Sequence, residues 1–427
     1  MPSLNPFFYR RLAMEKHSTV VASFTIGVDL GDRRSHACVV DGEGKVVETF
    51  SVLTDAANFE KKFKRERCRI VIEAGTHSPW VSRRLEELGH EVLVAHPRAV
   101  RAIYQSDGKD DVKDAEMLAR LGRADPQLLH PIRHRGVKVQ EDLALIRGRD
   151  HMVRARTQLI NGVRGLMKSA GARAPSGGSE SFHKKVLLHV PEGLKPGLMP
   201  MVEMAEELTK RIKDYDRAVE YLAETRYPAS KTMMQIRGVG ALTTLSYMLV
   251  LEDPAKFERS RSAAAYVGLV PRRDQSGATN KQLRITKAGS SLVRRLLVTS
   301  AQYILGPFGS DSDLRRFGLE LAKRGGKAAK KRAVVAVARK LATLMHRLWV
   351  TGEVYEPLRA ARLRGEIPGE TAGAAQIPEE IKMPTPPQPG PPRRETTARL
   401  DRHELSLKAA GRAGRWKPGL PRNPVMV

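Results

Sequence analysis

Apolar and polar positions in the first quarter of the chain follow the pattern of alternating strands and helices. Five apolar runs of strand length are bounded by polar or glycine-containing segments: residues 23–29, 36–40, 46–52, 68–73 and 91–95. Two intervening segments have the pattern of helices: residues 56–67 and 79–88. The turn at 41–44 contains two glycines, which supply the positive φ of a hairpin. Three hairpin-linked strands followed by strand–helix alternation predict a mixed sheet covered by helices.

After residue 131 the pattern changes to long basic helices. Apolar residues recur every seventh position, at Ile146, Val153, Ile160 and Met167. Arginines occupy other positions of the same segment: Arg147, Arg149, Arg154, Arg156 and Arg164. This predicts an amphipathic helical arm with a cationic face, and a second helix around residues 202–225.

Glycines at positions 148, 162 and 165 weaken the prediction of a coiled coil in this arm. Two interpretations therefore stay open. One is a packed helix with a solvated basic face. The other is a dimerising arm that binds nucleic acid, for which Arg147, Arg154 and Arg164 are the candidate contacts.

The remaining sequence completes a division into five segments. Residues 230–357 predict a mainly helical unit in which no strand is placed, and the proline- and charge-rich end predicts disorder. The predicted segments are an irregular lead (1–20), a ribonuclease-H-like α/β domain (21–130), a basic helical linker (131–229), the helical domain (230–357) and a disordered basic tail (358–427).

Charge is the compositional feature that bears most on function. The 427 residues include 74 Lys and Arg against 47 Asp and Glu, a net charge of +27. Such a surplus indicates a polyanionic partner, and nucleic acid is the first choice. No apolar run approaches the ~20 residues that a membrane-spanning helix needs, so we expect a cytoplasmic, nucleoid-associated protein. Two cysteines, Cys38 and Cys68, offer neither a disulfide framework nor a Cys-rich zinc site.

Two carboxylates stand at the ends of predicted strands. Asp29 ends the first strand and Glu73 ends the fourth. Functional groups in open α/β sheets collect at the carboxyl ends of such strands, although an aspartate at a strand end is by itself common in turns. Neighbouring Asp32 is a further possible ligand, but its setting is more typical of a solvated turn.

Asp111 and Asp114 open a predicted helix and share one of its faces. Either alone would be explained by the helix macrodipole, and Asp110 is a geometric substitute for Asp111. Four carboxylates in compatible positions favour a magnesium site, because hard oxygen ligands suit Mg²⁺ and crowded carboxylates require a cation. Two ions roughly 4 Å apart could promote in-line displacement at phosphorus.

The segment after Asp29 also resembles the first phosphate turn of sugar kinases and actin-like ATPases. Those folds need a second glycine-rich phosphate loop, and the sequence between residues 130 and 300 has none. An ATPase is therefore a distant alternative.

The helical domain carries several candidate phosphate contacts. Gly238 and Gly240 resemble a helix-hairpin-helix turn with free backbone N–H groups. Ser276 lies among cations that could hold a phosphodiester, and other cations lie near helix starts. These cations are Arg272, Arg273, Arg284, Lys287, Arg294, Lys327 and Lys331. For each, a turn residue or a solvated charge is the alternative.

Together these motifs resemble the DEDD family of insertion-sequence transposases over roughly residues 22–357. The segment 109–115 is similar to the family's Lys-x-Asp-x-x-Asp-Ala helix start, which favours Asp111 over Asp110. Segments 268–271 and 276–277 are similar to its Gly-Leu-x-Pro and Ser-Gly motifs, and 287–289 with 294–295 to its Lys-x-Gly and Leu-Arg helix. Arg237 departs from the proline usual before the Gly-x-Gly turn.

The resemblance implies an RNA-guided recombinase with a Holliday-junction-resolvase-like N-terminal domain. Asp29, Glu73, Asp111 and Asp114 would hold Mg²⁺, and Ser276 would attack DNA to give a phosphoserine intermediate. It also implies donor and target DNA, a guide-type noncoding RNA and a homo-oligomer, dimeric or tetrameric. The main alternative is a metal-dependent nuclease or junction resolvase without serine catalysis. A noncatalytic DNA- or RNA-binding protein is another.

Overall fold

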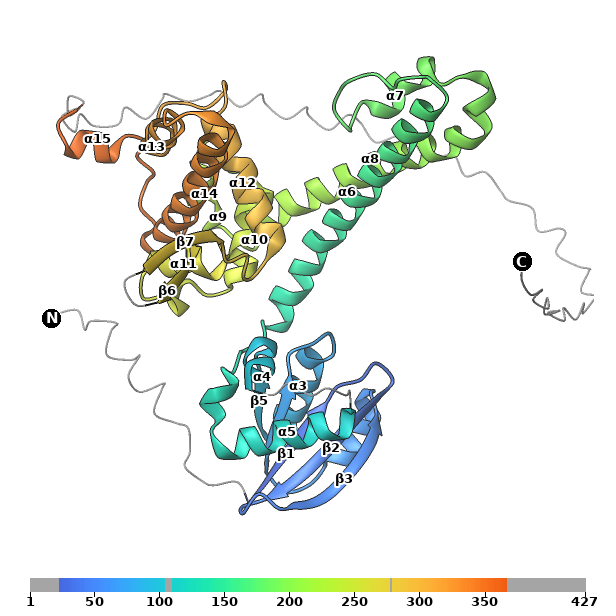
Figure 1. Ribbon diagram of the computed structural model, residues 1–427, viewed down its shortest axis with the longest axis vertical. Helices are drawn as coiled ribbons and strands as arrows, with labels where there is room; N and C mark the ends of the chain where they lie inside the picture. The colour runs from blue at the N-terminus through green and yellow to red at the C-terminus, as the bar shows by residue number, and fades with distance from the viewer. Residues whose placement is uncertain (1–22, 104–109, 277–278, 367–427) are drawn as a thin grey trace, which may run out of the picture. The chain divides into compact units, whose positions relative to one another are not determined.

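The computed structural model describes residues 23–103, 110–276 and 279–366 of the chain (Figure 1). The predicted lead (1–20) and the tail from residue 367 onward lie outside the described residues. No described helix combines the length and the apolar character needed to cross a membrane.

The N-terminal part contains the mixed five-stranded sheet that the sequence predicts. Its strands are Phe24–Asp29 (β1), Arg34–Asp41 (β2), Val46–Leu53 (β3), Arg69–Glu73 (β4) and Glu91–Ala95 (β5). The strand order is β3-β2-β1-β4-β5, with β1 antiparallel to β2 and parallel to β4. The ribonuclease-H-like prediction is confirmed.

Helices cover both faces of this sheet because successive strand residues point to opposite sides. They are Ala56–Phe63 (α2), Ser78–Glu87 (α3), Pro97–Ile103 (α4) and Asp111–Ala124 (α5). Ile26 and Val28 of β1 share a buried cluster with Phe59 of α2 and Val81 of α3. The alternate residues of β1 and β4 face α5, where Val71 packs with Leu118.

Gly27 lets α5 lie directly on β1. A Cβ atom at this position would come within 2.0 Å of the Ala115 carbonyl oxygen and 2.4 Å of the Ala119 nitrogen. Gly27→Ala should therefore push α5 outward and lower the free energy of unfolding by about 3 kcal/mol, the upper range for overpacking. Urea unfolding measures this. Gly42→Ala, where no atom lies within 4 Å of the added Cβ, should change it by less than about 1 kcal/mol, and equal effects would contradict the prediction.

The middle of the chain is a helical hairpin of two long helices with a short helix between them. These are Val137–Ser169 (α6), Phe182–Val186 (α7) and Lys195–Thr225 (α8). The heptad residues Ile160 and Met167 are buried in a cluster with Phe182 of α7 and Val202 of α8. Two of the glycines that weaken the coiled-coil prediction lie where α8 comes closest. A Cβ at Gly148 would lie 3.0 Å from the Tyr215 hydroxyl, and one at Gly162 would lie 2.8 Å from the terminal methyl group of Met201.

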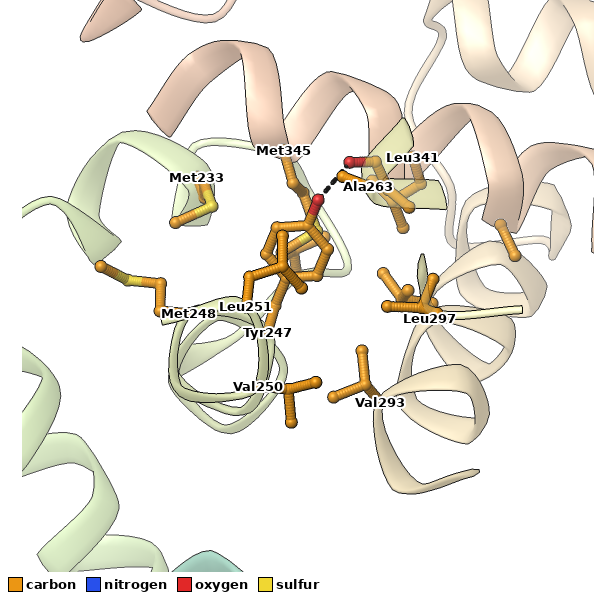
Figure 2. Packing of buried hydrophobic residues seen from close by; sticks show 14 of the residues in the cluster. Met233, Tyr247, Met248, Val250, Leu251, Ala263, Val293, Leu297, Leu341 and Met345 are labelled. Atoms are coloured by element: carbon orange, nitrogen blue, oxygen red, sulfur yellow. Dashed lines mark hydrogen bonds between the residues drawn. The ribbon is translucent and has the colours of Figure 1, made fainter. Parts of the chain in front are cut away.

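The C-terminal part is mainly helical. Its helices are Ser230–Met234 (α9), Ala241–Leu251 (α10), Ser260–Tyr266 (α11), Ser291–Leu305 (α12), Asp313–Ala322 (α13), Gly326–Thr351 (α14) and Arg359–Leu363 (α15). Figure 2 shows Tyr247 of α10 among the apolar side chains of this core, where its hydroxyl donates to the Ala342 carbonyl oxygen at 2.6 Å. Ile146 of α6 belongs to the same core.

Two sequence expectations need correction here. The unit contains a two-stranded antiparallel sheet, Pro271–Ser276 (β6) with Thr279–Ile285 (β7), where no strand was placed. The charged composition of these segments concealed the strands. Order also extends past residue 358, because Asp313 accepts backbone N–H bonds from Ala360 and Ala361 (2.7 and 3.2 Å), which fixes α15.

Candidate functional site

Asp29 and Glu73 lie next to each other at one edge of the sheet. They are the last residues of β1 and β4, which run parallel with Val28 opposite Ile72. Each therefore follows the last position at which β1 and β4 pair with each other. Both are partly exposed, and each stands two positions after a residue that faces α5, Gly27 on β1 and Val71 on β4. Their side chains thus lie on the α5 face of the sheet edge.

The first turn of α5 reaches the same edge. The middle of α5 lies over Gly27 through Ala115 and Ala119, and at its far end Arg123 donates to the Gly42 carbonyl oxygen at 2.9 Å. The turn that contains Gly42 lies at the start of β1, so α5 runs antiparallel to β1. Its N-terminal residues Asp111 and Asp114 therefore approach the carboxyl end of β1.

The pKa of Glu73 shows that the acidic side chains act on one another. Burial raises this pKa most, and the charges of Asp29 and Asp114 raise it further. The cation of Arg101 on α4 lowers it. Like charges oppose the ionisation of a carboxyl group only at short range. The carboxyl ends of β1 and β4 and the first turn of α5 therefore lie close to one another.

Asp110 caps the start of α5. It is the N-cap of α5, and its carboxylate accepts N–H bonds from Val112 and Lys113 at 3.1 and 3.4 Å. Such a cap stabilises the helix start. Asp110 is therefore held by the backbone of the helix that it begins.

The donor set at this edge suits a hard divalent cation, because it consists of carboxylates. Within the described ranges, no group of three His, Cys, Asp or Glu side chains is already arranged to hold an ion.

Two features of this edge lie outside the sequence predictions. Arg101 acts on Glu73 but is one of 74 basic residues, so no signal distinguished it. His77, which precedes α3, accepts from the indole N–H of Trp80 at 3.1 Å and lies 3.4 Å from Asp32. The sequence places His77 three residues before Trp80, and this spacing could have indicated their contact. The Asp32 side chain is 94% exposed, as in a solvated turn.

Three of the predicted nucleic-acid contacts line one groove. The groove has a volume of about 980 Å³ and lies between one face of α6 and one face of α12. Arg154, Lys287 and Arg294 line it, together with Arg295. The Asp150 carboxylate bridges its two sides by pairing with Arg154 at 2.7 Å and Arg295 at 2.5 Å.

The predicted nucleic-acid contacts differ in what surrounds their side chains. Arg294 holds the preceding turn by donating to the carbonyl oxygens of Val267 (3.0 Å) and Ala288 (2.6 Å). Arg164 lies over the Phe182 ring at 5.2 Å. The exposed cations are Arg147, Arg272, Arg284, Lys287, Lys327 and Lys331.

The Gly-x-Gly turn and the serine hairpin complete the set. Gly238 has a φ of +94° and lies against Tyr303, and Gly240 is the N-cap of α10 without a side-chain cap. Ser276 ends β6, with its backbone opposite Thr279. The side chains of Ser276 and Arg273, and residue Gly277, lie outside what the structure describes.

Comparison with known proteins matches both halves of the chain. Residues 26–171 match the family model of DEDD transposases of the IS110 type, and residues 230–311 match that of the IS116/IS110/IS902 transposase family. The transposase of insertion element IS1111A from Coxiella burnetii is 29% identical over 337 residues, which are 77% of this chain and 90% of the relative. A Sinorhizobium fredii protein named "putative transposase y4pF/y4sB" is 30% identical over 295 residues, 67% of this chain and 74% of the relative.

Proposed function

This chain belongs to the IS116/IS110/IS902 family of insertion-sequence transposases, and from that membership we propose that it exchanges DNA strands through a phosphoserine intermediate under the guidance of an RNA. Membership makes it a DNA-binding enzyme that transfers phosphodiesters and uses a divalent metal. Beyond this membership, we propose the serine nucleophile, the RNA guide, the number of metal ions and the roles of individual residues.

The observation that carries the metal assignment is that the carboxyl ends of β1 and β4 lie side by side and the first turn of α5 reaches the same edge. Burial and the charges of Asp29 and Asp114 oppose the ionisation of Glu73 in the free protein. A cation at this edge would offset the repulsion between the carboxylates, which supports them as its ligands. We assign Asp29, Glu73, Asp111 and Asp114 as ligands of two Mg²⁺ ions, which when bound neutralise the scissile phosphate and stabilise the departing oxygen.

Ser276 supplies the nucleophile in this proposal. Its oxygen bonds to phosphorus as the bond from phosphorus to the departing strand breaks, and the serine proton passes to the oxygen of that strand. A hydroxyl of a second strand then displaces the serine in the reverse sense. Because each bond broken is replaced by one of the same kind, rejoining needs no ATP.

The basic groove between α6 and α12 is the proposed surface for the guide RNA. Its cations come from two segments far apart in sequence, Arg154 on one side and Lys287 and Arg295 on the other. Phosphates arriving there would replace Asp150 as the partner of Arg154 and Arg295. The RNA would then supply sequence specificity by base pairing, while the protein contacts its backbone.

Arg154→Gln should weaken RNA binding several-fold and lower the slope of log K against log salt concentration by about 1. Filter binding between 50 and 300 mM salt measures the slope. The matched control is Arg217→Gln on α8, because Arg217 is also exposed and pairs with an aspartate of its own helix, Asp214, at 2.6 Å. Equal slopes in the two variants would remove this groove from the proposal.

The whole proposal is tested with full-length protein, element-end DNA, the RNA transcribed from the element's flank, and Mg²⁺. A covalent adduct of DNA with Ser276, identified by peptide mass spectrometry, is the expected result. Cleavage without any adduct would establish the nuclease or resolvase alternative. Light scattering of the same complex tests the proposed dimer or tetramer.

A further inference from the structure

A second polar cavity lies in the helical hairpin, between α7 and α8. Its volume is about 280 Å³. The cavity is lined by residues of α7 and α8 and of the segment before α7: Glu180, His183, Lys184, Glu206, Thr209, Lys210 and Lys213. None of these residues belongs to the carboxylate site, the serine hairpin or the groove of α6 and α12.

A buried cation lies behind this cavity. Arg156 of α6 is only 7% exposed, and its Nη1 donates to the Thr209 hydroxyl oxygen at 3.2 Å. That hydroxyl donates in turn to the Ala205 carbonyl oxygen at 2.8 Å. The Nε of Arg156 has no partner among the described residues. Burial lowers the pKa of Arg156, since a cation removed from water is costly without an anion.

His183 supplies an independent sign of a missing partner. It lines the cavity, is 8% exposed, and its Nδ1 has no partner among the described residues. Buried polar atoms in native proteins are almost always hydrogen-bonded. The unpartnered His183 Nδ1 in the cavity wall therefore indicates that a polar ligand or water completes this place.

The charges around the cavity favour an anion. Lys184, Lys210 and Lys213 line it, and Arg156 adds a fourth cation, against the two carboxylates of Glu180 and Glu206. Glu206 is already paired with Lys210 at 3.1 Å. Glu180 attracts Arg156 through its charge. Four cations against two carboxylates leave a surplus of two positive charges.

We propose that this cavity is a phosphate-binding site, in which His183 forms the base and Lys184 and Lys213 form the rim. The Arg156 cation, which lies behind Thr209, adds positive charge to the site without lining it. A volume of 280 Å³ compares with ~30 Å³ for one water, so a tetrahedral group of five heavy atoms fits with its waters. Several cationic donors around one point are the chemistry that recognises a phosphate. The inference goes beyond the proposed function, because it depends on neither the carboxylates nor Ser276.

The first test is a titration of the full-length protein with inorganic phosphate at constant ionic strength, followed by calorimetry and by the melting temperature. Saturable binding and a rise in melting temperature are expected. Arg156→Met and the double variant Lys184→Ala/Lys213→Ala should each weaken binding about tenfold or more. The double variant changes rim residues alone, so it decides the matter if Arg156→Met does not fold.

The control is Arg211→Met on α8, because Arg211 is 65% exposed, pairs with Glu207, and does not line the cavity. It should bind phosphate as the unchanged protein does. The inference is overturned if the unchanged protein shows no saturable binding, or if the double variant binds phosphate as tightly as this control.

A second arm identifies the source of the phosphate. If the ligand is a phosphate of a nucleic-acid backbone, the double variant should lower the slope of log K against log salt for RNA or DNA binding by about 2. If the ligand is free phosphate, the slope stays unchanged while binding of inorganic phosphate is lost. Strand cleavage by the double variant is also measured, with saturating nucleic acid. An unchanged cleavage rate shows that the proposed catalytic site is intact, so a failure of the cavity can be told from a failure of that site.

Discussion

A Glu73→Gln protein is expected to bind element-end DNA normally and to cleave it slower by a factor on the order of 10³ or more, because a neutral amide cannot hold the metal in place of a carboxylate. Single-turnover cleavage with saturating DNA and Mg²⁺ measures the rate. The matched control is Glu66→Gln, an exposed carboxylate of the same domain, which should keep the full rate. Full cleavage by Glu73→Gln would exclude Glu73 as a ligand.

The same variant should be more stable than the unchanged protein when no metal is present. Burial and the neighbouring carboxylates raise the folded-state pKa of Glu73 above its ordinary value. Its contribution to stability is therefore complete below the pKa of an unfolded glutamate, about 4.3, and is lost as the pH rises through the folded-state value. At neutral pH this is a penalty, which Glu73→Gln removes.

Mg²⁺ should reverse that order. Binding to the folded state alone stabilises the unchanged protein in proportion to the logarithm of the Mg²⁺ concentration, whereas Glu73→Gln should gain little. Urea unfolding at pH 4 and pH 7, with and without Mg²⁺, measures both effects. A Glu73→Gln protein that is less stable at pH 7 without metal would show that Glu73 serves packing rather than cation binding.

Ser276→Ala is expected to abolish the covalent protein–DNA adduct completely, since alanine has no oxygen to bond to phosphorus. DNA binding and Mg²⁺-dependent stabilisation should stay as in the unchanged protein, because the carboxylates are intact. Denaturing gel electrophoresis of end-labelled DNA detects the adduct. Ser262→Ala is the control, because Ser262 is an exposed serine of α11 that lies outside the groove of α6 and α12.

Two results would contradict this role of Ser276. Adduct formation by Ser276→Ala would place the nucleophile at another residue. Unchanged cleavage by Ser276→Ala, in reactions where the unchanged protein also forms no adduct, would favour the nuclease or resolvase alternative. Loss of the adduct in both serine variants would point to a general defect in complex assembly.

Local patterns were sufficient to predict the sheet. Each strand of the N-terminal part is an apolar run ended by polar or glycine residues, so β1 and β4 fall within a residue or two of their predicted bounds. Because Asp29 and Glu73 terminate those runs, their place at the carboxyl edge also follows from sequence. The β6–β7 hairpin was not predicted, because its strands are rich in charged and polar residues and lack apolar alternation. Antiparallel backbone pairing between the two strands holds the hairpin instead.

The sequence by itself determined which carboxylates end strands or begin a helix, and that the protein needs a polyanionic partner. Only the tertiary structure decided that α5 runs antiparallel to β1, bringing Asp114 close enough to raise the pKa of Glu73. It also decided that Arg156, one of several similar arginines of α6, is the buried one. Strand and helix propensities are local, whereas burial and electrostatic contact depend on which distant segments pack together.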